Sequence, residues 1–232
     1  MAPRNGASAL TRPRIVDAAV ALADEEGLRA VSMRRLAAQL GVEAMSIYHH
    51  VPNKAAILDA MTDRVFEGFH LPSTDGDWRV ELHARADSIR TTLLRHRWGL
   101  ELVDSRRSPG RATLAHHDAV IGCLRNAGCS LALTAHAFAL LDAHHFGFVA
   151  QELRLPFEDG EALDPLAADI DANVPLAEFP HFAEFVTGVA LRPGYAFGDE
   201  YGWGVELLLD ELERRRAAEA PSTVAERDGT AP

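Results

Sequence analysis

The stretch Ser32–Lys54 constrains the fold more than any other part of the chain, because it contains start and stop signals for two short helices. Ser32 can accept a hydrogen bond from a free backbone N–H of the next turn, as a helix N-cap does. Gly41 follows an apolar helical stripe, at a position where helices commonly end in the left-handed conformation that glycine adopts at little cost. The apolar pattern then restarts, and residues 43–50 can form a second short helix with Ile47 turned inward. Two short helices joined by a tight glycine turn predict a helix-turn-helix.

The outward residues of the second expected helix are of types that contact duplex DNA. Such a helix fits the major groove, and its N-terminal residues reach the base edges. Arg34, near the start of the first helix, can donate two hydrogen bonds to guanine, and Ala44 or Met45 can touch a thymine methyl group. Donors suited to phosphate oxygens, which fix the register without reading sequence, are present on Tyr48, His50 and Lys54. The alternative is a surface-exposed helical hairpin whose basic residues are incidental.

Three runs within this stretch match a known family. They are Leu40-Gly41-Val42-Glu43, Ile47-Tyr48-His49-His50-Val51 and Asn53-Lys54. On these residues the chain resembles the DNA-binding segment of the tetracycline repressor (TetR) family, and in particular its namesake branch. His49 stands where the namesake has a tryptophan and Ala44 where it has a glutamine, so we expect a different operator sequence. From the pattern and the resemblance together, the residues expected to read bases are Arg34, Ala44, Met45, Ser46 and His49. Those expected to contact phosphates are Ser32, Arg35, Tyr48, His50 and Lys54.

The net charge of −11 is unevenly distributed along the 232 residues. Residues 1–54 hold seven Lys or Arg and five Asp or Glu, a net charge of +2, so the rest of the chain carries −13. A weakly basic head on an acidic body is compatible with DNA binding, because only the surface that faces the phosphates matters. The overall acidity therefore does not exclude a nucleic-acid partner.

Composition and cysteine usage indicate the compartment. The chain is 47% hydrophobic, an ordinary value for a soluble globular protein. Its N-terminus has no apolar run typical of a signal peptide, and no stretch is apolar for long enough to span a bilayer. Cys123 and Cys129 have neither the spacing nor the number of a disulfide framework or a zinc site, and we interpret them as small core residues. We expect a cytoplasmic protein with no membrane partner.

The remaining periodicity predicts an all-α fold. Besides the helix-turn-helix, helices are indicated from Thr11 to Gly27, through 82–93, and over 111–126, 131–152 and 199–217. Residues 156–180 are acidic and proline-rich, and we interpret them as a flexible flap beside a pocket or as a solvated linker. The expected organisation is a disordered arm (1–10), a helix-turn-helix DNA-binding domain (11–54) with a connecting helix (53–69), a ligand-binding and dimerisation domain (70–217) and a disordered tail (218–232).

The resemblance covers most of residues 12–217 and implies where a small molecule binds. The namesake binds a magnesium–tetracycline complex. Its pocket histidine corresponds to His70, its pocket asparagine to Arg85 and its water-mediated metal carboxylate to Glu152. The histidine that ligates the metal directly corresponds to Val103, which cannot coordinate a metal, so we expect no metal or other cofactor and a different ligand, such as one with an acidic group facing Arg85. The candidate pocket residues are His70, Arg85, Ile89, His117, Val120, His144, Phe148 and Glu152.

Two adjacent histidine pairs, His116-His117 and His144-His145, raise the question of a metal site. Histidine is a common metal ligand. Neighbouring residues on a helix point about 100° apart, however, so one pair does not easily chelate one ion. The sequence also lacks an HExxH pattern. We therefore favour satisfied core or pocket-lining histidines over a dedicated metal site.

A single short reading helix contacts few bases, which favours a dimer. Dimers place two reading helices about 34–36 Å apart on a palindromic site. The expected function is a ligand-responsive transcriptional regulator, a homodimer that represses from a double-stranded DNA operator and is released by a small-molecule effector. The resemblance implies that the helices over 131–152 and 199–217 of each subunit form a four-helix bundle. Two alternatives remain at this point, a histidine-rich metal-dependent enzyme and a constitutive DNA-bridging protein.

Overall fold

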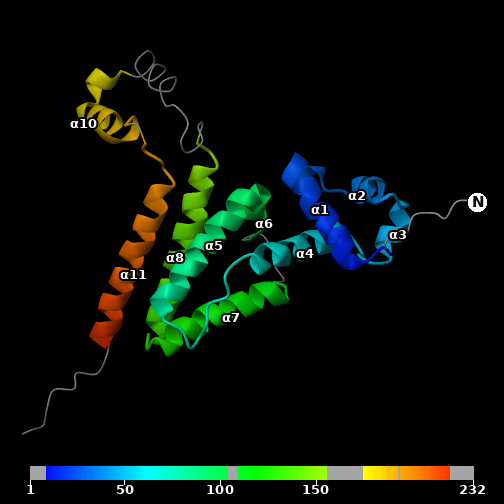
Figure 1. The fold of residues 1–232 in the computed structure, drawn as a ribbon, viewed down its shortest axis with the longest axis horizontal. Coiled ribbons are helices and arrows are strands. Elements are labelled where there is room, and N and C mark those ends of the chain that lie inside the picture. Colours follow the sequence, from blue (N-terminus) through cyan, green and yellow to red (C-terminus); the bar gives the residue numbers. More distant parts are fainter. Residues whose placement is uncertain (1–8, 104–108, 156–174, 193, 220–232) are drawn as a thin grey trace, which may run out of the picture. The chain divides into compact units, whose positions relative to one another are not determined.

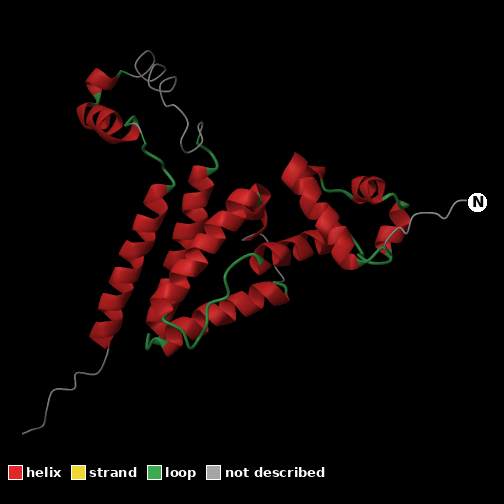
Figure 2. Cartoon of the chain, in the orientation of Figure 1, coloured by secondary structure: helices red, strands yellow, loops and turns green. Residues whose placement is uncertain are grey.

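The computed structural model describes residues 9–103, 109–155, 175–192 and 194–219, and within these ranges the ordered elements are helices, with no strand (Figure 2). This confirms the predicted all-α class. The helices, labelled in Figure 1, are α1 (Arg12–Glu26), α2 (Met33–Leu40), α3 (Ala44–Tyr48), α4 (Lys54–Glu67), α5 (Trp78–Arg95), α6 (Leu100–Val103), α7 (Arg111–Asn126), α8 (Leu131–Glu152), α10 (Pro180–Phe185) and α11 (Asp199–Glu219). Short 3₁₀ segments are η1 (Leu28–Ala30), η2 (Arg97–Gly99) and η3 (Leu176–Glu178), and a π-helical turn is η4 (Val186–Ala190).

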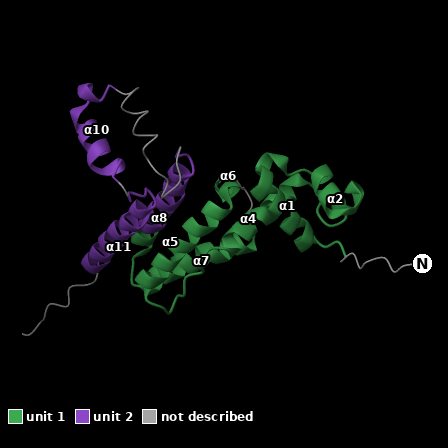
Figure 3. Cartoon of the chain, turned by 45° about the horizontal axis from the view of Figure 1, so that its top comes forward, with its two compact units in different colours: residues 1–134 green, residues 135–232 purple. Residues whose placement is uncertain are grey.

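The chain divides into two compact units, coloured separately in Figure 3. Unit 1 is residues 1–134 and unit 2 is residues 135–232, so the boundary falls in the first turn of α8. Within unit 1, α4 packs against both α1 and α7. This helix therefore connects the three N-terminal helices with the helices that follow.

The N-cap expected at Ser32 forms in the structure, and the helices expected from Thr11 and over 53–69 begin at caps of the same kind. The hydroxyls of Thr11 and Ser32 accept hydrogen bonds from the backbone N–H three residues along, at 3.4 and 3.3 Å, and begin α1 and α2. Asn53 begins α4 in the same way, accepting from Ala56 N at 2.9 Å. Helices α7 and α8 have the bounds that the sequence predicted. Local capping chemistry and apolar spacing thus account for most of the helix boundaries.

The predicted apolar stripes form the core. In the three N-terminal helices the buried side chains include Ile15, Ala19, Leu22, Leu36, Ala37 and Ile47. On α4 and α5 the buried apolar side chains include Ile57, Met61, Val65, Leu82, Ala86, Ile89 and Leu93. Cys123 and Cys129 are buried thiols, as expected of small core residues, and burial raises the pKa of the Cys123 thiol to about 11.

The structure corrects three sequence-based boundaries. Helix α3 ends at Tyr48 rather than near His50, since Val51 precedes Pro52, and a residue before proline is disfavoured in the helical region. Of the segment expected to be irregular, residues 156–180, the structure describes 175–180, where η3 forms, and α10, which was not expected, begins at its last residue, Pro180. Helix α11 continues through Glu219, past the expected start of the tail at 218. The remaining parts of the expected arm, flap and tail, residues 1–8, 156–174 and 220–232, lie outside the described residues.

The missed helix α10 has a physical explanation. Pro180 occupies its first turn, which proline tolerates because that N–H has no helical partner. Its aromatic residues Phe182 and Phe185 are exposed, each at 52%, so the helix has no buried apolar stripe of the kind that identifies helices in a sequence. Among the described residues, no helix is long and apolar enough to cross a bilayer.

Candidate DNA-reading head and effector site

The turn between α2 and α3 is a glycine-dependent helix stop. Gly41 has φ 68° in the left-handed region. The N–H of Gly41 donates to the carbonyl of Ala38 at 3.3 Å, and that of Val42 donates to the carbonyl of Ala37 at 3.0 Å. This pair of bonds is the Schellman arrangement, which satisfies the last free carbonyls of a helix. It fixes the angle at which α3 leaves α2.

Helix α3 is anchored by one side chain and presents the others outward. Ile47 is fully buried, whereas Met45 and Tyr48 are 66% and 44% exposed. The other proposed base-reading residues are the exposed Arg34 and His49 and the half-buried Ala44 and Ser46. Among the expected phosphate contacts, His50 and Lys54 are exposed and Ser32, the cap of α2, is half-buried. These residues thus lie on α2, α3 and the start of α4, or directly beside the ends of these helices.

Arg35 differs from the other expected phosphate contacts, because its guanidinium is already paired. Both of its terminal nitrogens donate to the two carboxylate oxygens of Glu26, at the end of α1. This hydrogen bonding lowers the pKa of the Glu26 carboxyl. The pair joins α2 to α1 on an exposed surface, a role that sequence reasoning missed because the two residues lie on different helices.

A second missed contact fastens the head to the helices that follow it. The Asp24 carboxylate on α1 accepts a hydrogen bond from Trp98 Nε1 at 2.7 Å, and its Oδ1 also lies 2.7 Å from His96 Nδ1. Trp98 is only 4% exposed, so its N–H depends on this acceptor. Nothing in the sequence spacing of Asp24 and Trp98 indicates this contact.

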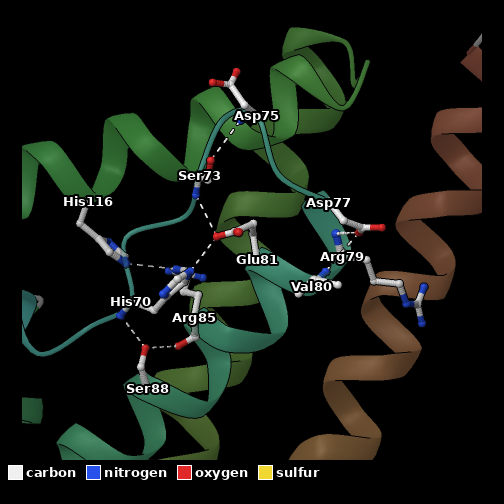
Figure 4. A network of polar contacts seen from close by, with 10 residues as sticks. All are labelled: His70, Ser73, Asp75, Asp77, Arg79, Val80, Glu81, Arg85, Ser88 and His116. Atoms are coloured by element: carbon white, nitrogen blue, oxygen red, sulfur yellow. Dashed lines mark hydrogen bonds and ion pairs between the residues drawn. The ribbon is translucent and has the colours of Figure 1, made fainter.

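The candidate effector residue His70 belongs to a polar network on α5 and the connection that precedes it, shown in Figure 4. His70 Nε2 lies 2.7 Å from the Glu81 carboxylate, which also accepts from the backbone N–H of Ser73 at 2.9 Å. The backbone N–H of His70 donates to Ser88 Oγ at 2.6 Å. The two bonds to Glu81, first the one from Ser73 and then the one with His70, lower the pKa of its carboxyl. The connection between α4 and α5 is therefore held by side chains of α5.

Arg85 lies in the same view with its guanidinium directed to His116 of α7 (Figure 4). Its Nε donates to His116 Nε2 at 3.3 Å, and the two side chains are each 1% exposed. Burial, and then the positive charge of Arg85, lower the pKa of His116 to about 3, so the imidazole is neutral at neutral pH. Because Nε2 accepts, Nδ1 carries the hydrogen, and this buried Nδ1 has no hydrogen-bond partner in the described part of the chain.

Aromatic rings surround this buried pair. The rings of Phe66 and Phe69 lie 5.4 and 5.6 Å from that of His116, in edge-on geometry. His117, a candidate pocket residue, contacts Phe66 at 5.7 Å. The candidates Ile89 and Val120 are both fully buried on the same helices, α5 and α7. Five of the eight expected pocket residues thus lie on α5, α7 and the α4–α5 connection of unit 1.

The other three expected pocket residues, His144, Phe148 and the half-buried Glu152, lie on α8 in unit 2. The His144 ring stacks on Tyr201 of α11, with centroids 5.3 Å apart and planes 18° apart. Phe148 stacks on Phe197 at 4.6 Å. A Cβ on Gly204 would overlap the His144 ring, so this glycine lets α11 approach α8. The two helices are joined by an aromatic cluster.

Both histidine pairs take part in packing. One ring of each pair is fully buried: His116 in the first pair and His145 in the second. His145 Nδ1 lies 2.9 Å from the Tyr201 hydroxyl. Within the residues that the structure describes, no three His, Cys, Asp or Glu side chains are close enough to hold a metal ion.

Comparison with known proteins finds two family models along the chain. Residues 15–61 match the family model described as bacterial regulatory proteins, tetR family, and residues 71–215 match the tetracyclin repressor-like C-terminal domain. The chain belongs to the TetR family. It is therefore a transcriptional regulator, not an enzyme, and it binds an operator as a homodimer and responds to a small-molecule effector.

Relatives with known names support this assignment over most of the chain. The HTH-type transcriptional repressor DrrR1 of Streptomyces coeruleorubidus is 32% identical over 225 residues, which are 91% of this chain and 82% of that protein. The class A tetracycline repressor of Escherichia coli transposon 1721 is 32% identical over 150 residues, 63% and 69% of the two chains. The crystal structure of ActR from Streptomyces coelicolor in complex with actinorhodin superimposes with a TM-score of 0.72 and 26% identity, covering 90% of this chain and 99% of ActR.

Proposed function

We propose that this TetR-family repressor reads its operator with Arg34, Ala44, Met45, Ser46 and His49. The observation that carries the proposal is the geometry of α3, in which buried Ile47 holds the helix while Met45 and Tyr48 face solvent. The side chains of Ser32, Arg35, Tyr48, His50 and Lys54 flank this surface and are proposed as phosphate contacts. For Arg35 this requires exchanging its bond with Glu26 for a phosphate, or sharing its donors between the two.

Selection of bound duplexes from a random pool, followed by mobility-shift titration at several salt concentrations, tests this surface. The double variant Arg34→Ala, Lys54→Ala should abolish the shift. Lys54→Ala alone should weaken binding to all duplexes and reduce the salt slope by about 2 per dimer, since each phosphate contact contributes roughly 0.9. Arg154→Ala, an exposed arginine after α8, is the matched control. Wild-type binding by the double variant would refute the assignment.

We propose that the effector carries an acidic group that binds at Arg85 and His116. The support is a buried guanidinium next to an imidazole whose Nδ1–H has no partner among the described residues. An anion there would accept from both groups, and such charge-assisted bonds are strong in a buried site. The aromatic rings of Phe66, Phe69 and His117 favour a flat ring system on the same molecule. ActR, a structural neighbour, is known in complex with a ligand, actinorhodin.

A matched pair of probes distinguishes charge from shape. Anthraquinone-2-carboxylate should raise the melting temperature of the protein and weaken operator binding, whereas its methyl ester should do neither. Arg85→Met should lose the response to the carboxylate while retaining the helical circular dichroism spectrum. Equal effects of acid and ester, or no effect of either, would refute the proposed acidic group.

We also propose the domain division and the setting in which the protein works. The DNA-binding domain would span 11–54, with the connecting helix over 53–69, and the ligand-binding and dimerisation domain 70–217, in keeping with the matched family models. The homodimer would form through α8 and α11, on which Leu140, Trp203 and Leu207 are 57%, 64% and 48% exposed. We propose that the protein works in the cytoplasm, where it can reach a DNA operator.

A further inference from the structure

Helix α4 carries two adjacent charged residues that bind different neighbours. The Asp63 carboxylate accepts from the backbone N–H of Thr113 at 3.3 Å and from its hydroxyl at 3.1 Å, on the first turn of α7. Arg64 Nη2 donates to Asp17 on α1 at 2.7 Å. Because consecutive helical residues point about 100° apart, one turn of α4 holds α7 with one side chain and α1 with the next.

The contact of Asp63 with α7 replaces a missing cap. Gly110 occupies the N-cap position of α7 and offers no side-chain oxygen. A Cβ at Gly110 would overlap the Asp63 carboxylate, so the glycine leaves the space into which this carboxylate fits. A carboxylate at a helix N-terminus satisfies free N–H groups and is favoured by the helix dipole. Thr113 is 5% exposed, so its hydroxyl also depends on this acceptor.

The two partners of α4 belong to different functional parts of unit 1. Helix α7 carries His116 and Val120 of the proposed effector site. Helix α1 packs against α2 and therefore sets the position of the reading head. We propose that Asp63 and Arg64 act as a clamp on α4, through which a displacement of the first turn of α7 is passed to α1 and the DNA-reading head. Both are positioning residues, because neither lies on the proposed DNA-contacting surface.

This inference rests on the proposed function for its biological meaning, and its test separates the two. Transmission from α7 to α1 must appear as measured coupling between a change at the α4–α7 contact and a change at the α4–α1 contact. Asp63→Ala removes the acceptor of both bonds from Thr113 on α7, and Asp17→Ala removes the acceptor of Arg64 on α1. Each should weaken binding to the selected operator duplex about two- to fivefold. The double variant should bind the operator as tightly as the single variant with the lower affinity, because either change already interrupts the same connection.

The control is Glu26→Gln, which alters another carboxylate of α1 that pairs with Arg35 of α2 rather than with α4. Combined with Asp63→Ala, its effect on operator binding should multiply to within about twofold, as for independent sites. Multiplying effects in the Asp63→Ala, Asp17→Ala pair would overturn the clamp, since a merely structural role of each contact predicts that result.

Hydrogen exchange of the full chain without DNA supplies a second readout. Asp63→Ala should raise amide exchange at least twofold in the first turn of α7 and in α1, whereas Glu26→Gln should leave α7 unchanged. Faster exchange in α7 with none in α1 would overturn the clamp and leave the proposed function intact. Failure to select any duplex would instead count against the proposed function, while the exchange of α1 would still decide the clamp.

Discussion

Asp24 provides a measurable link between the reading head and the helices behind it, and its replacement by alanine should destabilise the protein by about 2 kcal/mol. The change leaves Trp98 Nε1, on a side chain 4% exposed, without its acceptor. A buried donor left unsatisfied costs about 1–3 kcal/mol. Loss of the His96 contact adds to this, but the Asp24 side chain is 31% exposed, so water can replace part of what is removed. About 2 kcal/mol corresponds to a fall in melting temperature of roughly 4–8 °C for a chain of this size.

Urea unfolding followed by circular dichroism and by tryptophan fluorescence measures this loss. Asp24→Asn keeps an oxygen that can accept from Trp98, so it should cost less than about 1 kcal/mol. Asp17→Ala is the matched control on the same helix, because its partner Arg64 is 42% exposed and such surface pairs contribute about 0–1 kcal/mol. Equal and small losses for Asp24→Ala and Asp17→Ala would show that the Asp24 contact does not fasten the head, and would refute the reasoning.

Three further predictions concern single residues. Gly204→Ala should destabilise the protein by about 1–3 kcal/mol in urea unfolding, because its methyl group would overlap the His144 ring; Gly147→Ala on α8, where a Cβ meets open space, should be neutral or stabilising. Gly41→Ala should cost about 1–2 kcal/mol in the same assay and weaken operator binding, because φ is 68° there, and an unchanged midpoint would contradict the assigned turn. His116 has a pKa lowered from 6.5 to about 3, so the unfolded state binds more protons and stability should fall as pH decreases from about 6.5 towards 3. His116→Gln should flatten this dependence in denaturation curves between pH 4 and 7, and an identical slope in the variant would contradict the buried neutral imidazole.

The helices of this protein follow from local chemistry. An N-cap side chain accepts from a backbone N–H only three residues along, so the local sequence accounts for the caps at Thr11, Ser32 and Asn53. The turn at Gly41 is local in the same sense. Helix α10 was not visible, because its exposed phenylalanines provide no buried stripe.

The candidate sites were also predictable only where they depend on residues of one helix. The outward face of α3 could be listed from the sequence once Ile47 was placed inward, because a helix of known register determines which residues share a face. The pairing of Arg85 with His116, and of Arg35 with Glu26, could not, since each joins two helices. The resemblance to the TetR family indicated where to look for the effector, and the structure showed a neutral His116 that no sequence pattern had singled out from its neighbour His117.

By itself, the amino-acid order of this chain determined its helices, its glycine turn and the identity of its DNA-reading segment, because each depends on residues that are near one another along the chain. The tertiary structure alone decided which carboxylate meets which donor. Asp24 reaches Trp98 and Asp63 reaches Thr113 across 74 and 50 residues of sequence. Such contacts exist only after apolar packing has brought the helices together, since the burial of α4 between α1 and α7 sets the distances over which these polar groups can bond.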